Sequence, residues 1–247
     1  LESGIFEKYK PDMFIALHVL PDLPTGTVGY HAGPYMASCD EIYITVRGKG
    51  GHAAQPSQYT DQIYIASEIV ITLKDTVRKL SEETGPALLG IGRISGRGAT
   101  NVIPETVEID CTFRAFDEDL RSRAKEVIRS TASAVALKYG VTIDPRIVEG
   151  YPVLVNDPAL VEIARELSIE LLGTDHVREM PTRMSSEDFS FFSERYPSFL
   201  FRIGVTPEGQ PLKLLHTPSA DIDEKAMVTG VANMTWLTVN LIAGEPR

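Results

Sequence analysis

The hydrophobic pattern between residues 40 and 150 switches between two periods. Ile42, Ile44 and Val46 alternate with polar residues, which predicts a half-buried strand. The same alternation from Thr106 to Phe113 predicts a second strand. Between Thr60, interpreted as the N-cap, and Leu80, apolar residues recur every three or four positions, which predicts a helix with one buried face.

A second predicted helix runs from about Asp117 to Tyr139, and Gly140 stops it. Two more strands are expected at 87–94 and 141–148. The order is then strand, helix, strand, strand, helix, strand, which is typical of a ferredoxin-like domain with one antiparallel sheet and two helices on one face.

The pattern on either side of this segment is different. An apolar run at 12–19 predicts a buried strand, and the proline-rich residues 21–34 predict a loop. After residue 152, a helix capped by Asn156, a buried strand at 197–205 and a last amphipathic helix at 223–243 alternate as in an α/β layer. We therefore expect an α/β domain at 1–38 and 151–247, with an inserted domain at 39–150.

Composition limits the classes of partner. The chain has 247 residues and a net charge of −10, which disfavours nucleic acid and anionic lipid. No uninterrupted apolar run reaches the roughly 20 residues that cross a bilayer, so we expect no membrane partner. The two cysteines, Cys39 and Cys111, are too few for a disulfide framework, which favours a reducing, cytoplasmic location.

Three of the five histidines stand at positions suited to chemistry. His18 ends a predicted strand, His52 follows glycines in a loop, and His216 lies in a loop near the carboxy end. Neutral imidazole is a common ligand of zinc and manganese. A single histidine after an apolar run is more often structural, and the wide spacing of the three leaves both roles open.

Five motifs together resemble the metal-dependent amidohydrolases that include aminoacylases and carboxypeptidases, in the branch of hippurate and indoleacetyl-amino-acid hydrolases. They lie in order along nearly the whole chain, at 16–40, 47–56, 98–117, 185–192 and 214–223. This resemblance implies a di-metal peptidase-like catalytic domain and an inserted lid or dimerisation domain. It also implies hydrolysis of N-acyl amino acids, hippurate-like or N-acetylated, by water activated on two zinc or manganese ions, and a homodimer formed through the lid.

The resemblance also implies roles for single residues. His18 and His216 match metal ligands, and His52 matches a histidine that polarises the scissile carbonyl in a neighbouring subunit. Asn101 and Glu187 match residues that bind substrate or line the site. Two of these have simpler alternatives, because asparagine beside glycine is a common turn former and Glu187 could cap the helix that it opens.

The chain also departs from the family pattern. A Cys-Gly-His-Asp-type motif and a Glu-Glu pair, which supply the remaining ligands and the general base, have no counterpart in a suitable place, so we expect the amino-terminal part to be missing. Two alternatives to an N-acyl amino acid hydrolase stay open. One is a truncated, non-catalytic chain that acts only through dimerisation of the lid, and the other is a small-peptide exopeptidase.

Overall fold

The computed structural model describes residues 4–244, which form two compact units. Unit 1 contains the residues up to Tyr35, Leu154–Arg183 and those from Glu187 onward, and unit 2 contains Met36–Val153 and Met184–Ser186. The inserted domain expected at 39–150 therefore begins three residues later and ends three residues earlier than the observed segment Met36–Val153. Residues 1–3 and 245–247, which belong to the expected α/β domain, lie outside the described residues.

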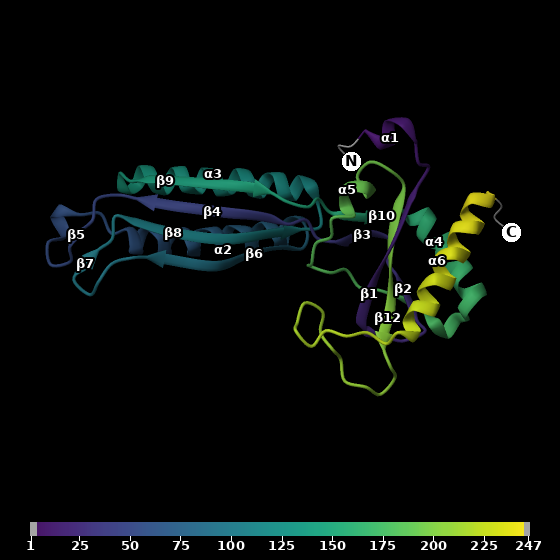
Figure 1. The fold of residues 1–247 in the computed structure, drawn as a ribbon. Coiled ribbons are helices and arrows are strands. Elements are labelled where there is room, and N and C mark those ends of the chain that lie inside the picture. The colour runs from purple at the N-terminus through teal and green to yellow at the C-terminus, as the bar shows by residue number, and fades with distance from the viewer. Residues whose placement is uncertain (1–3, 245–247) are drawn as a thin grey trace. The chain divides into compact units, whose positions relative to one another are not determined.

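Unit 2 is built on a four-stranded antiparallel sheet with the strand order β6-β8-β4-β9. Helices α2 and α3 lie on the same face of this sheet and share its hydrophobic core (Figure 1). The element bounds are β4 (Asp40–Arg47), α2 (Gln62–Thr84), β6 (Ala87–Gly96), β8 (Thr106–Ala115), α3 (Glu118–Tyr139) and β9 (Thr142–Glu149). The short strands β5 (Gly51–His52) and β7 (Val102–Ile103) form a separate ribbon, and a 3-10 turn follows at Pro56–Gln58.

Helix α2 begins one residue later than the pattern indicates. Asp61, not Thr60, is its N-cap, because the Asp61 carboxylate accepts a hydrogen bond from the Tyr64 N–H at 3.0 Å. Thr60 is engaged elsewhere, since its hydroxyl accepts from the Lys49 N–H at 3.0 Å. The interpretation of Thr60 as the cap is therefore wrong.

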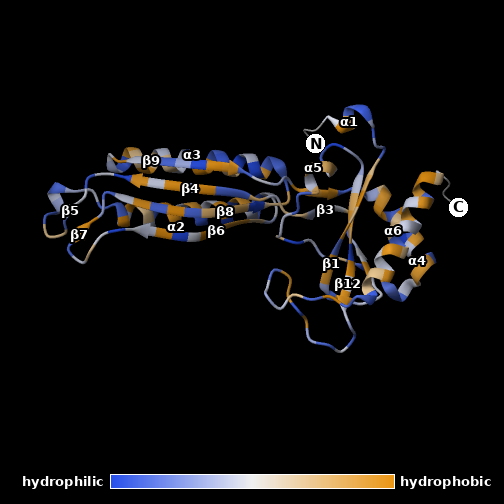
Figure 2. Ribbon diagram, in the orientation of Figure 1, coloured by the Kyte–Doolittle hydropathy of each residue, from blue (hydrophilic) through white to orange (hydrophobic). Residues whose placement is uncertain are grey.

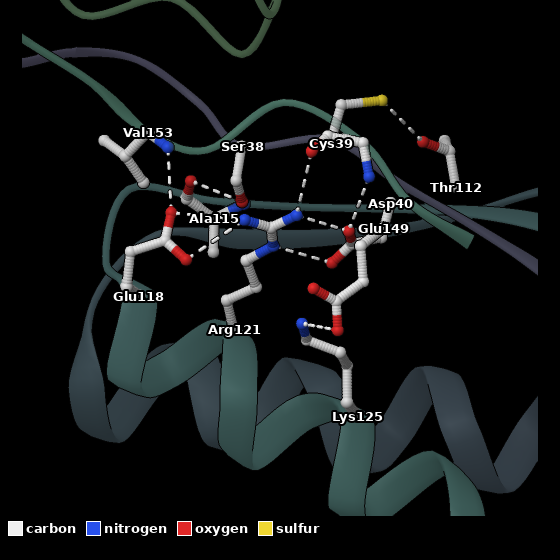
Figure 3. Close-up of polar contacts among 11 residues, drawn as sticks. Ser38, Cys39, Asp40, Thr112, Ala115, Glu118, Arg121, Lys125, Glu149 and Val153 are labelled. Atoms are coloured by element: carbon white, nitrogen blue, oxygen red, sulfur yellow. Dashed lines mark hydrogen bonds and ion pairs between the residues drawn. The ribbon is translucent and has the colours of Figure 1, made fainter. Parts of the chain in front are cut away.

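A buried ion pair and its hydrogen bonds connect β4, α3 and the residues after β9 in unit 2 (Figure 3). Arg121, on α3, donates two hydrogen bonds to the Asp40 carboxylate, at 2.8 Å and 2.6 Å. Glu118 accepts from Arg121 at 3.1 Å and from the Val153 N–H at 2.8 Å, and Asp40 accepts from the Gly150 N–H at 3.2 Å. The cluster fixes the start of β4, the first turns of α3 and the residues after β9 to one another.

Unit 1 is a mixed sheet with the strand order β1-β12-β2-β11. β1 and β12 pair in parallel and are largely hydrophobic (Figure 2). The bounds are α1 (Ile5–Lys8), β1 (Phe14–Pro24), β2 (Val28–Tyr30), β3 (Gly33–Met36), β10 (Leu154–Asn156), α4 (Pro158–Leu172), β11 (Val177–Glu179), α5 (Ser190–Ser193), β12 (Ser198–Thr206) and α6 (Lys225–Ala243), with a 3-10 turn at Thr174–His176. All residues of β12 are buried, as expected for a central strand. Helices α4 and α6 contribute to one core with this sheet.

Two expectations for unit 1 are corrected. Residues 21–34 are not all loop, since β1 continues to Pro24 and both β2 and part of β3 follow. Asn156 does not cap α4, because Asp157 accepts from the N–H groups of Ala159 and Leu160. Asn156 is instead fully buried, where its amide bonds the N–H and carbonyl of Leu200 and the carbonyl of His31.

Within residues 4–244, α6 is a helix long and apolar enough to cross a membrane by length and composition alone, with a mean hydropathy of 1.3. The expectation that no such segment exists is therefore too strong. One face of α6 is buried through Ala226, Gly230, Asn233 and Leu237. The core helix of a globular domain passes the same test, so α6 alone is weak support for a membrane partner.

Candidate functional site

The structure brings two of the candidate residues together in unit 1. His18 lies within β1, rather than at its end, and Arg202 of β12 is its register partner. The His18 Nε2 atom is 3.9 Å from the Glu187 Oε2 atom, and the two side chains are 33% and 19% exposed. At this separation the pair is too long for a direct hydrogen bond, and both side chains are partly shielded from solvent.

The hydrogen bonding of His18 suits a metal ligand. Its Nδ1 atom lies 2.7 Å from the Val19 carbonyl oxygen, which can only accept, so in the neutral imidazole Nδ1 carries the proton and Nε2 has the free lone pair. Metal-bound histidines commonly donate their other N–H to a backbone carbonyl in this way. His18 and Glu187 therefore offer one nitrogen and one carboxylate to a divalent ion.

His216 is not joined to this pair. It lies in the exposed segment between β12 and α6, with a positive φ of 62°. Among residues 4–244, no group of three or more His, Cys, Asp or Glu side chains is arranged to hold a metal ion. The described side chains thus fit part of a metal centre, and the assignment of His216 as a ligand stays a prediction.

His52, in unit 2, is exposed at the end of β5. Its Nδ1 atom accepts a hydrogen bond from the Ala54 N–H at 3.1 Å. In the neutral imidazole the proton is then on Nε2, so the Nε2–H group can donate a hydrogen bond to a ligand. A donor of this kind suits an oxygen atom that gains negative charge during amide hydrolysis.

Asn101 lies beside His52 in the same unit. The turn from Ala99 to Val102 is closed by two backbone hydrogen bonds of 3.1 Å, and the Asn101 carbonyl accepts from the Ala53 N–H at 3.0 Å. His52 and Val102 also face each other in the β5–β7 ribbon. The two loops that contain the candidate residues of unit 2 are therefore held together by main-chain bonds, and Asn101 also forms a turn, as its sequence context suggests.

One local interpretation is corrected. Glu187 does not cap a helix with its side chain, because the N-cap of α5 is Phe189 and has no side-chain cap bond. Arg114 of β8 is half-buried and donates a hydrogen bond to the Met184 carbonyl at 2.9 Å. This bond joins β8 to the Met184–Ser186 segment of unit 2, and no sequence signal indicated it.

The chain is similar to several known hydrolases. It is 32% identical over 239 residues to the N-acetyldiaminopimelate deacetylase of Bacillus subtilis, with 95% of this chain and 62% of that protein covered. It is 30% identical to an IAA-amino acid hydrolase of Arabidopsis thaliana, with 94% and 53% covered. The chain thus spans between half and two thirds of the length of these relatives.

The fold is similar to that of a solved Bacillus subtilis protein described as a dinuclear metal-binding peptidase from the M20 family. The TM-score is 0.80 at 25% identity, with 99% of this chain and 60% of that chain covered. Residues 1–238 match the model of peptidase family M20/M25/M40, which is nearly the whole chain. The chain therefore belongs to peptidase family M20/M25/M40.

Proposed function

We propose that the protein hydrolyses the amide bond of N-acyl amino acids, N-acetylated or hippurate-like, with water activated by divalent metal ions. The observation that supports this most strongly is the family match over residues 1–238. The named activities of the relatives agree, since both the deacetylase and the IAA-amino acid hydrolase cleave an acyl group from an amino acid. We propose zinc or manganese as the metal.

The described residues supply part of the chemistry that this reaction needs. His18 and Glu187 would hold an ion through one nitrogen and one carboxylate. A bound divalent ion lowers the pKa of its water ligand and polarises the amide oxygen. We assign the oxyanion contact to His52, and substrate binding to Asn101, which immediately precedes β7 of the same ribbon. His216 is proposed as a further ligand.

Replacement of His18 tests the metal site. We expect His18→Ala to weaken zinc or manganese binding by the full-length protein at least about tenfold, because the variant loses a ligand rather than a supporting contact. Metal retained after dialysis, measured by elemental analysis, gives the result. His176→Ala, at an exposed histidine in the 3-10 turn of unit 1, is the matched control and should keep its metal. Unchanged metal content in both His18→Ala and Glu187→Gln would show that these residues are not metal ligands.

We further infer that unit 2 is a ferredoxin-like lid and dimerisation domain. Its sheet has two edges, β6 and β9. β9 contains Pro145, which has no N–H to offer to a neighbouring strand. β6 has no proline, and apolar side chains are exposed along it and on the adjacent helix α2, namely Ile63, Ile71, Leu88 and Ile94. These features favour β6 as the edge that pairs with a second copy.

A charge placed at this edge tests the dimer. We expect the double substitution Ile71→Lys and Ile94→Lys to convert a dimer to a monomer, because two like charges would then meet their symmetry copies in an apolar interface. Sedimentation velocity measures the change. Val148→Lys, at an exposed apolar residue of β9, should leave the dimer intact. A wild-type protein that is monomeric at micromolar concentration, or a Val148→Lys variant that alone dissociates, would rule out the β6 interface.

A further inference from the structure

A cavity of about 900 Å³ lies on unit 2 beside the β5–β7 ribbon. Its walls include Gly50 and Gly51, and four charged side chains line it, Arg93, Arg97, Glu105 and Glu108. The cavity adjoins His52 and Asn101 along the chain but includes neither of them. The roles proposed for those two residues therefore leave this cavity unexplained.

The walls are fixed by main-chain contacts. The Gly48 N–H donates to the Glu105 carbonyl at 3.0 Å, and the Thr60 N–H donates to the Lys49 carbonyl at 2.9 Å. A Cβ atom at Gly50 would lie 2.7 Å from the Ile103 carbonyl oxygen, so the two backbones approach more closely than any other residue would permit. The cavity is thus part of the folded loops rather than a gap between mobile ones.

Two of the four charged side chains neutralise each other. Arg93 donates to Asp110 at 2.7 Å and to Glu108 at 3.0 Å, so its guanidinium and both carboxylates are satisfied. Arg97 and Glu105 remain. Among the described residues, neither side chain forms an ion pair or hydrogen bond, with each other or with a third group. One unpaired cation and one unpaired anion therefore line the same cavity.

We propose that this cavity binds a free α-amino acid with an apolar side chain. The carboxylate of the ligand would pair with the Arg97 guanidinium, and its ammonium group with the Glu105 carboxylate. Val102, Ile103 and Pro104 also line the cavity and give the ligand side chain an apolar surface. A ligand with only one charge would leave one of the two protein charges without a partner. The site requires neither a metal ion nor turnover, so it stands independently of the proposed hydrolase activity.

The test is a titration of the metal-free chain with three ligands that share a six-carbon skeleton: L-norleucine, which carries both charges, hexanoate and hexylamine. Amide chemical shifts of Gly50 and Gly51 report binding at the cavity. We expect saturable shifts with norleucine and about fivefold weaker binding of each of the other two, which lose one ion pair. Arg97→Ala and Glu105→Gln should each weaken norleucine binding about fivefold, the effect of one exposed ion pair.

Two further variants separate the site from general charge effects. The exchanged variant Arg97→Glu/Glu105→Arg keeps one charge of each sign and should recover most of the affinity. The pair Arg129→Ala and Glu126→Gln alters exposed charges on α3, away from the cavity, and should change nothing. The proposal is overturned if norleucine gives no saturable shifts, if hexanoate binds as well as norleucine, or if Arg97→Ala and Glu105→Gln bind norleucine like the wild type.

Discussion

Replacement of Arg121 by alanine is expected to lower the free energy of unfolding by about 3–5 kcal/mol, the cost of leaving a buried charge without its partner. Asp40 is completely buried and the Arg121 side chain is 6% exposed. The same contact, with Asp40 as its main cause, raises the pKa of Arg121 further above its ordinary value. Removal of the guanidinium would also take one hydrogen-bond donor from Glu118.

Urea unfolding of the chain, followed by circular dichroism, measures this change. Lys125→Ala is the matched control, because Lys125 lies one turn further along α3 and pairs with Glu149, which is 66% exposed (Figure 3). We expect that variant to lose no more than about 1 kcal/mol. If Arg121→Ala and Lys125→Ala were equally stable, the Asp40–Arg121 pair would not anchor the ends of unit 2.

Replacement of His52 by alanine is expected to lower the turnover of the full-length protein about 10²–10³-fold, the usual effect of removing one oxyanion donor. The physical basis is the bond from the Ala54 N–H to His52 Nδ1, which leaves Nε2–H free to donate. Because His52 is assigned to the substrate oxygen and not to the metal, the metal content should not change.

Steady-state kinetics with an N-acetyl amino acid, together with elemental analysis of the same samples, separate the two effects. A loss in kcat with little change in KM is expected, because the contact strengthens only as charge develops on the oxygen atom. His176→Ala again provides the control. Loss of metal from His52→Ala would show that His52 is a metal ligand. An unchanged kcat would show that His52 does not take part in the reaction.

Local pattern was sufficient for most elements of unit 2. In the strands and helices of this unit, apolar and polar residues alternate with a regular period. The type of each element could therefore be predicted from residues that are close together in the sequence. The misplaced cap illustrates the limit. Thr60 and Asp61 are both good caps, and the choice between them depends on the bond between Thr60 and Lys49, which the sequence does not reveal.

Buried polar and small residues were the main source of error. Arg121 lies within the inward stripe of α3, but its partner Asp40 belongs to a different element, so the pattern could not distinguish it from a surface charge. On α6 the apolar residues Met227 and Val231 are four positions apart, as on a buried helix face, yet they are 51% and 68% exposed. The buried face contains Gly230, whose missing side chain permits close packing against Ile203. The small residues Ala226 and Gly230 thus lie inward together with the apolar residues Met234, Leu237 and Leu241.

The candidate site was predictable as a set of residues but not as an arrangement. The motifs indicated His18 and Glu187 separately and gave Glu187 no connection to the metal. Their proximity depends on β1 and on the segment before α5, which only the fold brings together. His216 lies in an exposed segment, and among residues 4–244 it belongs to no group of three or more side chains that could hold a metal ion.

The most direct test of the proposed function is release of free amine by the full-length protein from a panel of N-acyl amino acids, before and after removal of metal. We expect hydrolysis of at least one N-acetyl or hippurate-like substrate in the presence of zinc or manganese, loss of activity with a chelator, and recovery when the metal is restored. No amine release at metal saturation, or release that a chelator does not reduce, would contradict metal-dependent amide hydrolysis as the function of this protein.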